Sequence, residues 1–465
     1  MVIGAAEQRY AALLARHGEA ATRQLAEISS TFRFGRFWPL TRAAQPFLLR
    51  RADHTRATEG ASLFLRGLLA MLTSPSAATA RSLAARPRRL ALLGDAIACG
   101  ALLGARVDML ATASGFKVLE INPTTPDFLP FGVECSDPLA ELFGENAAVR
   151  AFMNEVPGAF VSLRPLLLDS FVSKHARRGG TGAPNLAVVY VPRSAAAGNA
   201  LAEDVPAPDP HFLSLFGYLM GRGLGVQLCR HDELRYDGKT LTANATSIDV
   251  VFTAGDPDYL DTCPDDDPLW RAVRDGAVGT ACGHPLGVLL DDKGLVADLS
   301  EALEGRTLDA ALIDGLSDVV PWTRRLLAGP TTFHGERVDL LAFVRDNRER
   351  LVLKPCIGMG GAGILLGWET SAEAWSHALA NLAVAYVVQE RVIGAKVRLL
   401  YLDGDDVANA TPTTKELSFD INPYVWSDGH AEGCLVRLSL TDTLNITLGA
   451  TMAPVYVVDD GTSAR

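Results

Sequence analysis

The sequence predicts a multidomain α/β protein that begins with a helical region. Its 465 residues exceed what one compact core usually holds, so we expect about two to four domains. Residues 1–104 repeat apolar side chains every three or four positions, which is the period of a helix. From residue 106 the period becomes two, and from residue 186 strand-like runs alternate with a helical stretch. This second pattern is typical of an α/β unit.

Composition narrows the class of partner. The net charge of −11 disfavours binding to nucleic acid or to an anionic membrane surface, and a small-molecule partner is expected instead. No run reaches the roughly 18 apolar residues of a membrane span, and the N-terminus lacks a signal-peptide pattern. The seven cysteines are scattered without a CxxC pair. We therefore expect a cytoplasmic location.

A β-hairpin is predicted in the run GARVDMLATASGFKVLEINPTTP, where two alternating segments flank the turn-rich ATASG. If the turn is centred on Ser114, equal offsets place Asp108 opposite Glu120 and Arg106 opposite Asn122. Strand alternation then puts all four side chains on one face of the hairpin.

Two facing carboxylates are destabilising unless a cation lies between them or water solvates both. Carboxylate and amide oxygens are the ligands that Mg²⁺ prefers. Asp108, Glu120 and Asn122 are therefore the candidate magnesium ligands. The alternative is an exposed hairpin face whose acids are bridged by Arg106 and Lys117.

A glycine-rich flap is predicted in LVLKPCIGMGGAGILLG. Gly358, Gly360 and Gly363 have GxGxxG spacing, but a strand rather than a helix is expected next, which argues against a dinucleotide-binding loop. A strand–loop–strand flap, which also contains Gly361, lets backbone amides approach phosphates closely. Lys354 on the first strand would add its charge there. A plain hairpin with an exposed lysine is the alternative.

A strand ending in Gln389 and Glu390 follows, within AYVVQERVIGAKVRLLYLDGD. Such a junction suits an adenine hinge, in which backbone groups read the base and a carboxylate accepts from the amino group or the ribose. A surface hairpin is the alternative. Lys396 and Arg398 alternate with apolar residues on the next strand and face either phosphate or water.

Together these motifs resemble the ATP-grasp superfamily. The metal motif precedes the flap by more than 200 residues, an order that resembles the circularly permuted group that includes glutathionylspermidine synthetase. That group has R-x-D, a gap and then E-x-N-x-x-T-P, and the matching residues here are Arg106, Asp108, Glu120, Asn122, Thr125 and Pro126. The segments DDKGLVADLSEA, LVLKPCIGMGGAG and VVQERV and the tail from GCLVRLSL also match.

The resemblance implies a permuted ATP-grasp fold with four parts. These are a helical region at 1–95, the metal-binding part of the core at 96–184, a Rossmann-like pre-ATP-grasp unit at 185–285, and a C-terminal part at 286–465 that carries the lysine, flap and hinge. It implies that Lys293 binds ATP, that Arg437 contacts the terminal phosphate, and that Arg106 and Lys354 share in catalysis.

The implied activity is ADP-forming ligation of a carboxylate to an amine through an acyl phosphate, with ATP and Mg²⁺ as cofactors. Two rivals are a kinase of the same fold and a catalytically silent nucleotide-binding protein. Asn122 is followed by Pro123 and Thr124, unlike in the synthetase, and the N-terminal region has no amidase-like cysteine site. The identity of the substrates therefore does not transfer, and a homodimer is left open.

The sequence contains a second candidate metal pair. EINP at 120–123 is echoed by DINP at 420–423, so Asp420 and Asn422 are the alternative ligands. That alternative needs an aspartate about twelve residues upstream in a hairpin, but position 408 is Ala408. The 108–122 hairpin is therefore preferred.

Overall fold

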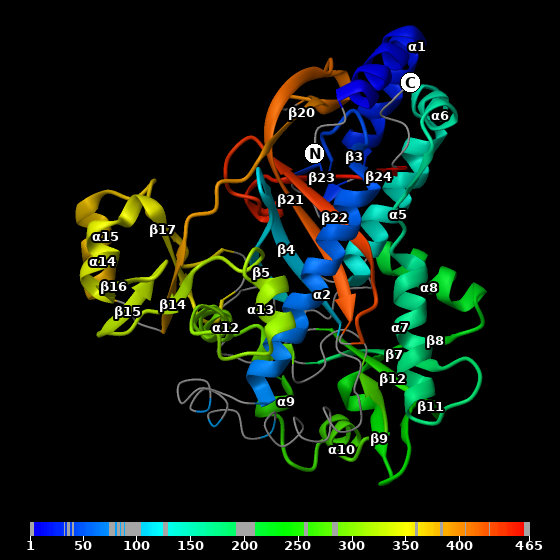
Figure 1. The fold of residues 1–465 in the computed structure, drawn as a ribbon. Coiled ribbons are helices and arrows are strands. Elements are labelled where there is room, and N and C mark those ends of the chain that lie inside the picture. Colours follow the sequence, from blue (N-terminus) through cyan, green and yellow to red (C-terminus); the bar gives the residue numbers. More distant parts are fainter. Residues whose placement is uncertain are drawn as a thin grey trace.

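The computed structural model describes residues 4–31, 33–34, 38–39, 41–73, 80, 84, 88, 104–123, 129–191, 210–254, 259–280, 287–358, 361–381, 385–404, 406–426 and 428–459. They form a mixed α/β fold with a large body and a smaller module beside it (Figure 1). None of the helices in these ranges combines the length and the apolar character that crossing a bilayer requires.

A six-stranded antiparallel sheet, here called the large sheet, runs through the body. Its strand order is β23-β22-β21-β4-β5, and β20 also pairs with β21. The long strand β21 holds the sheet together, because β20 pairs with its first half and β4 with its second half. The bounds are β4 Gly104–Thr112, β5 Gly115–Asn122, β20 Lys396–Tyr401, β21 Thr413–Trp426, β22 Ala431–Ser439 and β23 Thr451–Ala453.

Helix α2 (Arg51–Thr73) packs on the large sheet and contacts β21, β22 and β5. Helices α12 (Lys293–Glu304) and α13 (Ala310–Leu316) pack on α2 in turn. Gly67 allows this approach, because a Cβ there would lie 2.8 Å from Leu316. This packing buries the face of the strands that contacts α2.

The described part of the N-terminal region contains the helices α1 and α2 and also short strands. Helix α1 (Gly4–Thr31) packs on α6 (Ala147–Glu155), and α5 (Leu129–Glu145) lies beside them. Strand β3 (Phe47–Arg50) runs parallel to β24 (Val455–Val458), whose other edge pairs with β6 (Gly158–Phe160). The remaining two strands are β1 Arg33–Phe34 and β2 Trp38–Pro39. The helical period did not reveal β3, because its four residues are too few to show a period of two.

The segment from 185 folds as a four-stranded parallel sheet in the order β13-β12-β7-β8. Its central strand β7 is buried over four consecutive residues, as expected inside a parallel sheet, whereas the edge strand β8 is largely half-buried or exposed. The strands are β7 Asn185–Tyr190, β8 Gly225–Arg230, β12 Val250–Ala254 and β13 Gly279–Thr280. The nearby helices are α7 Arg164–Arg177, α8 Pro210–Gly221, α9 Tyr259–Thr262 and α10 Pro268–Arg274, and a small antiparallel sheet comprises β9 Leu234–Tyr236, β10 Leu241–Ala243 and β11 Thr246–Ile248.

Residues 321–390 form the small module, drawn in yellow in Figure 1. Its antiparallel sheet has the order β14-β19-β17-β18, and its core includes Trp322, Phe333 and Trp375. The strands are β14 Thr323–Arg325, β15 Pro330–Phe333, β16 Glu336–Asp339, β17 Leu351–Pro355, β18 Leu365–Leu366 and β19 Tyr386–Glu390, and the helices are α14 Leu340–Asp346 and α15 Ala372–Ala380. Helix α11 (Gly287–Leu290) precedes α12, and short 3₁₀ turns lie at His231–Glu233, Arg348–Arg350, Val407–Asn409 and Ile446–Leu448.

Residues 391–395 connect the small module to the large sheet. They join β19, in the small module, to β20, which pairs with β21 in the large sheet. The predicted pair of consecutive strands is therefore present, but the two strands do not form a hairpin.

Candidate functional site

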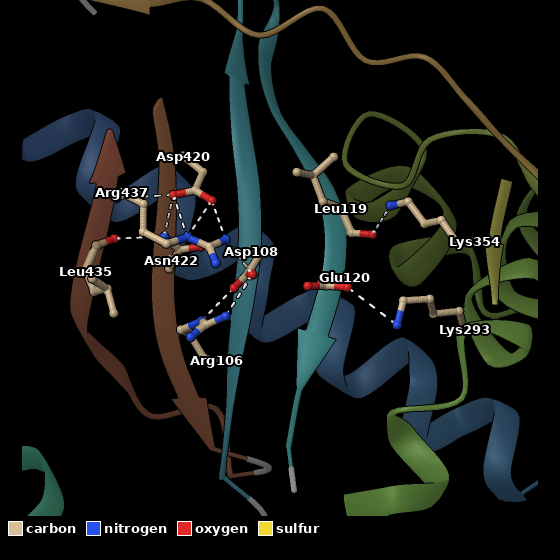
Figure 2. A network of polar contacts seen from close by, with 10 residues as sticks. All are labelled: Arg106, Asp108, Leu119, Glu120, Lys293, Lys354, Asp420, Asn422, Leu435 and Arg437. Atoms are coloured by element: carbon tan, nitrogen blue, oxygen red, sulfur yellow. Dashed lines mark hydrogen bonds and ion pairs between the residues drawn. The ribbon is translucent and has the colours of Figure 1, made fainter. Parts of the chain in front are cut away.

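The predicted hairpin carries its polar residues in the expected register. Strand β4 pairs with β5 so that Asp108 faces Glu120 and Arg106 faces Asn122, which confirms the predicted pairing. Asp108 and Glu120 are shown on these two strands in Figure 2. The turn itself is tighter than expected, because Thr112 pairs with Gly115. A β-bulge opposite Asp108 and Met109 leaves Leu119 without a partner in the register. This extra residue brings Asp108 back into line with Glu120. Bulges of this kind often lie beside active sites.

Two arginines compensate the charge of the buried carboxylate of Asp108. Nε of Arg106 lies 2.6 Å from Oδ1 of Asp108, and Nη2 of Arg437 lies 2.7 Å from Oδ2. Asp108 and Arg106 are each only 1% exposed. Burial by itself raises the pKa of Asp108, but the two arginines outweigh it and hold that pKa below its ordinary value. Asp108 is therefore an ionised carboxylate that forms ion pairs with Arg106 and Arg437.

The DINP segment lies beside the hairpin instead of competing with it. Asp420 on β21 faces Arg437 on β22, and β21 in turn pairs with β4. Nε of Arg437 donates to Oδ2 of Asp420 at 3.0 Å, and Nη2 bonds to the same oxygen. The two motifs that the sequence presented as alternatives thus meet on one face of the large sheet (Figure 2). The EINP and DINP echo was the one sequence signal for Asp420.

Glu120 faces a lysine that is presented by the start of helix α12. Nζ of Lys293 lies 3.5 Å from Oε2 of Glu120. Asp292 caps this helix by accepting from the backbone N–H of Gly294 at 2.8 Å, as Asp commonly does at an N-cap. The backbone N–H of Lys293 donates to the carbonyl of Cys356 at 2.8 Å. This bond ties α12 to the strand that leads into the flap.

Lys354 reaches the same hairpin from the small module. Its Nζ donates to the carbonyl of Leu119 at 3.0 Å and to Oε1 of Gln389 at 2.8 Å. Leu119 is the bulged residue, so its carbonyl lies outside the regular ladder. Burial lowers the pKa of Lys354 to about 8, and the nearby Lys293 acts in the same direction while Glu120 opposes it. Lys354 is buried, contrary to the alternative of an exposed lysine.

The side chains predicted for the adenine hinge already have partners. Nε2 of Gln389 donates to Oγ1 of Thr323 at 3.1 Å. Oε1 of Glu390 accepts from the backbone N–H of Trp322 at 2.8 Å, and Oε2 lies 2.8 Å from Nε2 of His334. Both side chains therefore fix the end of β19 against β14 and the β15–β16 hairpin. The backbone of these two residues is also paired, because β19 lies between β14 and β17 in the sheet.

The flap connects two paired strands, as predicted, because β17 and β18 pair antiparallel. Gly358 and Gly361 are described, whereas Gly360 lies outside the described residues. Gly361 has a φ of 77°, and a Cβ there would lie 3.6 Å from Nδ2 of Asn445 in the segment after β22. The hydroxyl of Tyr386 donates to the carbonyl of Gly363 at 3.1 Å. The flap is thus anchored on β19, and Gly361 lies near Asn445 in the segment between β22 and β23.

Lys396 and Arg398 lie apart from this cluster of charges. Both are exposed on β20, and Nζ of Lys396 lies 4.0 Å from Oδ1 of Asp442. Arg398 is paired in register with Glu416 on β21. The structure therefore brings Lys293, Lys354 and Arg437 to the hairpin but leaves these two cations at the surface.

The donor set fits a magnesium ion in part. The side chain of Glu120 is 29% exposed, and Nδ2 of Asn122 is buried and has no hydrogen-bond partner among the described residues. Because amide nitrogen and oxygen are assigned from their bonds, the rotated amide would present an oxygen ligand instead. Both oxygens of Asp108 already accept from guanidiniums, so a cation there would compete with Arg106 and Arg437 for this carboxylate. No group of three His, Cys, Asp or Glu side chains at metal-binding distance occurs within the described ranges.

Comparison with known proteins gives a likeness of fold. No family model matches the sequence, and no curated protein matches it. A solved structure titled "a glutathione synthetase like-effector (GSS30) from Globodera pallida in apoform" aligns with 94% of this chain and 96% of its own, at a TM-score of 0.57 and 11% identity. A "Putative gamma-glutamylcysteine synthetase" from Methylobacillus flagellatus KT covers 82% of this chain and 88% of its own, at a TM-score of 0.39 and 14% identity. Because its sequence identity is only 11%, the first match supports a likeness of fold alone: this chain shares its fold with a glutathione synthetase-like protein.

Proposed function

We propose that this protein is an ATP-dependent carboxylate–amine ligase with a circularly permuted ATP-grasp fold. The observation that carries the proposal is the meeting of four segments that are distant in sequence. The hairpin 104–122, the start of α12, strand β17 and the β21–β22 pair bring their charged residues to one face of the large sheet (Figure 2). These are the segments that carry the ATP-grasp motifs in the sequence.

The balance of charge at this face favours an anionic ligand. Four cations face three carboxylates, so the cluster has an excess of positive charge in a protein whose net charge is −11. Low-dielectric surroundings strengthen the attraction for phosphate groups. The cations are Arg106, Lys293, Lys354 and Arg437, and the carboxylates are Asp108, Glu120 and Asp420.

In the proposed reaction an oxygen of the substrate carboxylate attacks the γ-phosphorus of ATP. The bond from that phosphorus to the bridging oxygen breaks, which gives an acyl phosphate and ADP. The amine then attacks the acyl carbon, loses a proton and expels phosphate to leave an amide. No covalent bond to the protein is needed, so positioning and charge stabilisation supply the rate enhancement.

Three of these cations have distinct places in this proposal. Lys293 and Lys354 hold phosphate oxygens beside β5, and Arg437 neutralises the charge that develops on the transferred phosphoryl group. The flap, anchored at Gly363, covers the phosphates and excludes water. A magnesium ion, when bound by Glu120 and Asn122, would supply further neutralisation of the phosphate oxygens.

The test is the identity of the products. Purified protein with MgATP and a panel of carboxylate and amine pairs should release ADP and phosphate in an amount equal to the amide formed. Hydroxylamine in place of the amine should trap the acyl phosphate as a hydroxamate. Stoichiometric AMP would refute the proposal, because an adenylating enzyme transfers the α-phosphoryl group instead.

Lys354→Met serves as the inactive variant and Lys174→Met as its matched control. Both lysines are 7% exposed, but Lys174 lies on α7, outside the proposed site. Only Lys354→Met should lose ATP binding. Equal loss in both variants would indicate a general effect of removing a buried lysine and would contradict the assignment.

A nucleotide-binding protein without turnover is the second candidate. The observation that favours it is that Asp108 is bonded to both Arg106 and Arg437. Glu120 and Asn122 are then the candidate oxygen ligands for a magnesium ion. ATP binding without ADP release, in the presence of the full substrate panel and Mg²⁺, would favour this candidate over the ligase.

A further inference from the structure

Asp420 is the most highly connected carboxylate at the proposed site. Its Oδ1 accepts from Nδ2 of Asn422 at 2.7 Å and from the backbone N–H of Arg437 at 3.2 Å. Its Oδ2 accepts from Nε of Arg437 at 3.0 Å and also bonds to Nη2. One carboxylate therefore binds both the main chain and the guanidinium of the same arginine (Figure 2).

These bonds fix the plane of the Arg437 guanidinium. A carboxylate that binds Nε and Nη2 together meets the side of the guanidinium in a two-bond arrangement, which sets direction as well as distance. Asp108 adds a bond to Nη2 at 2.7 Å from the neighbouring strand β4. Arg437 is thus held between two acids, with its side chain 11% exposed.

Asp420 itself cannot touch a ligand in this arrangement, because its side chain is 0% exposed. Whatever it contributes to binding must act through Arg437. The cost of burying its charge is also evident, because burial and the nearby Asp108 raise its pKa although Arg437 opposes the rise. A carboxylate kept at such a cost beside a second acid calls for a role besides packing.

We propose that Asp420 is a positioning residue that aims the guanidinium of Arg437 at the terminal phosphate of ATP. The inference rests on the proposed function and adds a residue and a specificity to it. Because the terminal phosphate distinguishes ATP from ADP, this pair sets the preference for the triphosphate. Asn422 supports the arrangement by fixing Oδ1 of Asp420 from within the same strand.

The experiment measures the dissociation constants of MgATP and MgADP by calorimetry and takes their ratio for each variant. Wild-type protein should bind ATP more tightly than ADP, and Arg437→Ala should abolish the preference. Asp420→Asn should reduce the preference by about tenfold to a hundredfold, the worth of a hydrogen bond to a charged group, while ADP affinity is unchanged. A merely structural loss would weaken both nucleotides alike.

Two further variants keep the test decisive. Asn422→Ala leaves Asp420 in place but removes its support, and it should reduce the ATP preference by about threefold or more. Asp53→Asn is the matched control, because Asp53 is also 0% exposed and paired with two arginines, at the start of α2. It should leave both affinities unchanged.

The failures of the two proposals are distinguishable. If wild-type protein binds neither nucleotide, the proposed function is refuted, and the role of Asp420 with it. If Arg437→Ala loses the ATP preference but Asp420→Asn and Asn422→Ala keep it, the nucleotide site stands and the positioning role is overturned.

Discussion

Replacing Lys354 by methionine should change the pH dependence of stability. A shift of pKa from 10.5 to about 8 means that the folded state disfavours the charged amine by about 3 kcal/mol. Between these two values the unfolded chain binds more protons than the folded one, so stability rises with pH in this window. Below pH 8 Lys354 is protonated in both the folded and the unfolded state, so the full free-energy cost of burying its charge is present. Methionine has a similar length and cannot titrate.

The quantity to measure is the difference in unfolding free energy between wild type and Lys354→Met, at pH 7 and at pH 10. Wild type should gain about 2.5 kcal/mol relative to the variant across this interval, and the titration of all other groups cancels in the difference. Urea unfolding followed by tryptophan fluorescence is a suitable assay, because Trp322 and Trp375 lie in the core of the small module. Parallel pH profiles for the two proteins would refute the reasoning.

Three further predictions concern the large sheet and the helices around it. Glu120→Gln should lower the rate of ADP release at least about a hundredfold with an unchanged circular dichroism spectrum, and full activity would exclude Glu120 as a ligand. Asp108→Ala leaves two buried guanidiniums less well compensated and should cost about 3–5 kcal/mol in urea unfolding, so a loss below about 1 kcal/mol would contradict the described network. Gly294→Ala places a Cβ 2.0 Å from Nη1 of Arg325 and should destabilise the protein by about 1–3 kcal/mol. In Gly217→Ala the new Cβ meets no described atom within 4 Å beyond its own helix backbone and chain neighbours, so this variant should stabilise α8 slightly. Equal effects of the two substitutions would show that Arg325 can move without cost.

Local periodicity was enough to predict the hairpin, because a short turn and a period of two leave few registers open. Even so, two errors cancelled. The turn is not centred on Ser114, and the bulge at Leu119 shifts the strand back, so Asp108 still faces Glu120. The strand–flap–strand order and the position of Lys354 on the first strand were likewise predictable from the glycine spacing, because β17 and β18 are adjacent in sequence.

Contacts between distant segments could not be predicted in this way. No local sequence pattern indicates that β21 pairs with β4. Asp420 was therefore treated as an alternative to the hairpin residues, whereas in the structure it lies beside them. The end of β19 shows the same limit. Gln389 and Glu390 look available for a ligand in the sequence, but Thr323 and Trp322, more than sixty residues earlier, occupy their side chains. Side-chain availability depends on tertiary neighbours, which one sequence does not specify.

The strand order of the large sheet also constrains how the chain folds during synthesis. Strand β4 meets its partner β21 only after some 300 further residues have been made, and β3 waits still longer for β24. At a ribosomal rate of about 5–20 residues per second, the edge of β4 is bare for roughly 15–60 seconds. An unpaired edge of this kind invites pairing with other chains. The parallel sheet and the small module can form earlier from nearer segments, whereas the face with the charged residues is completed only after β21 and β22 have been made.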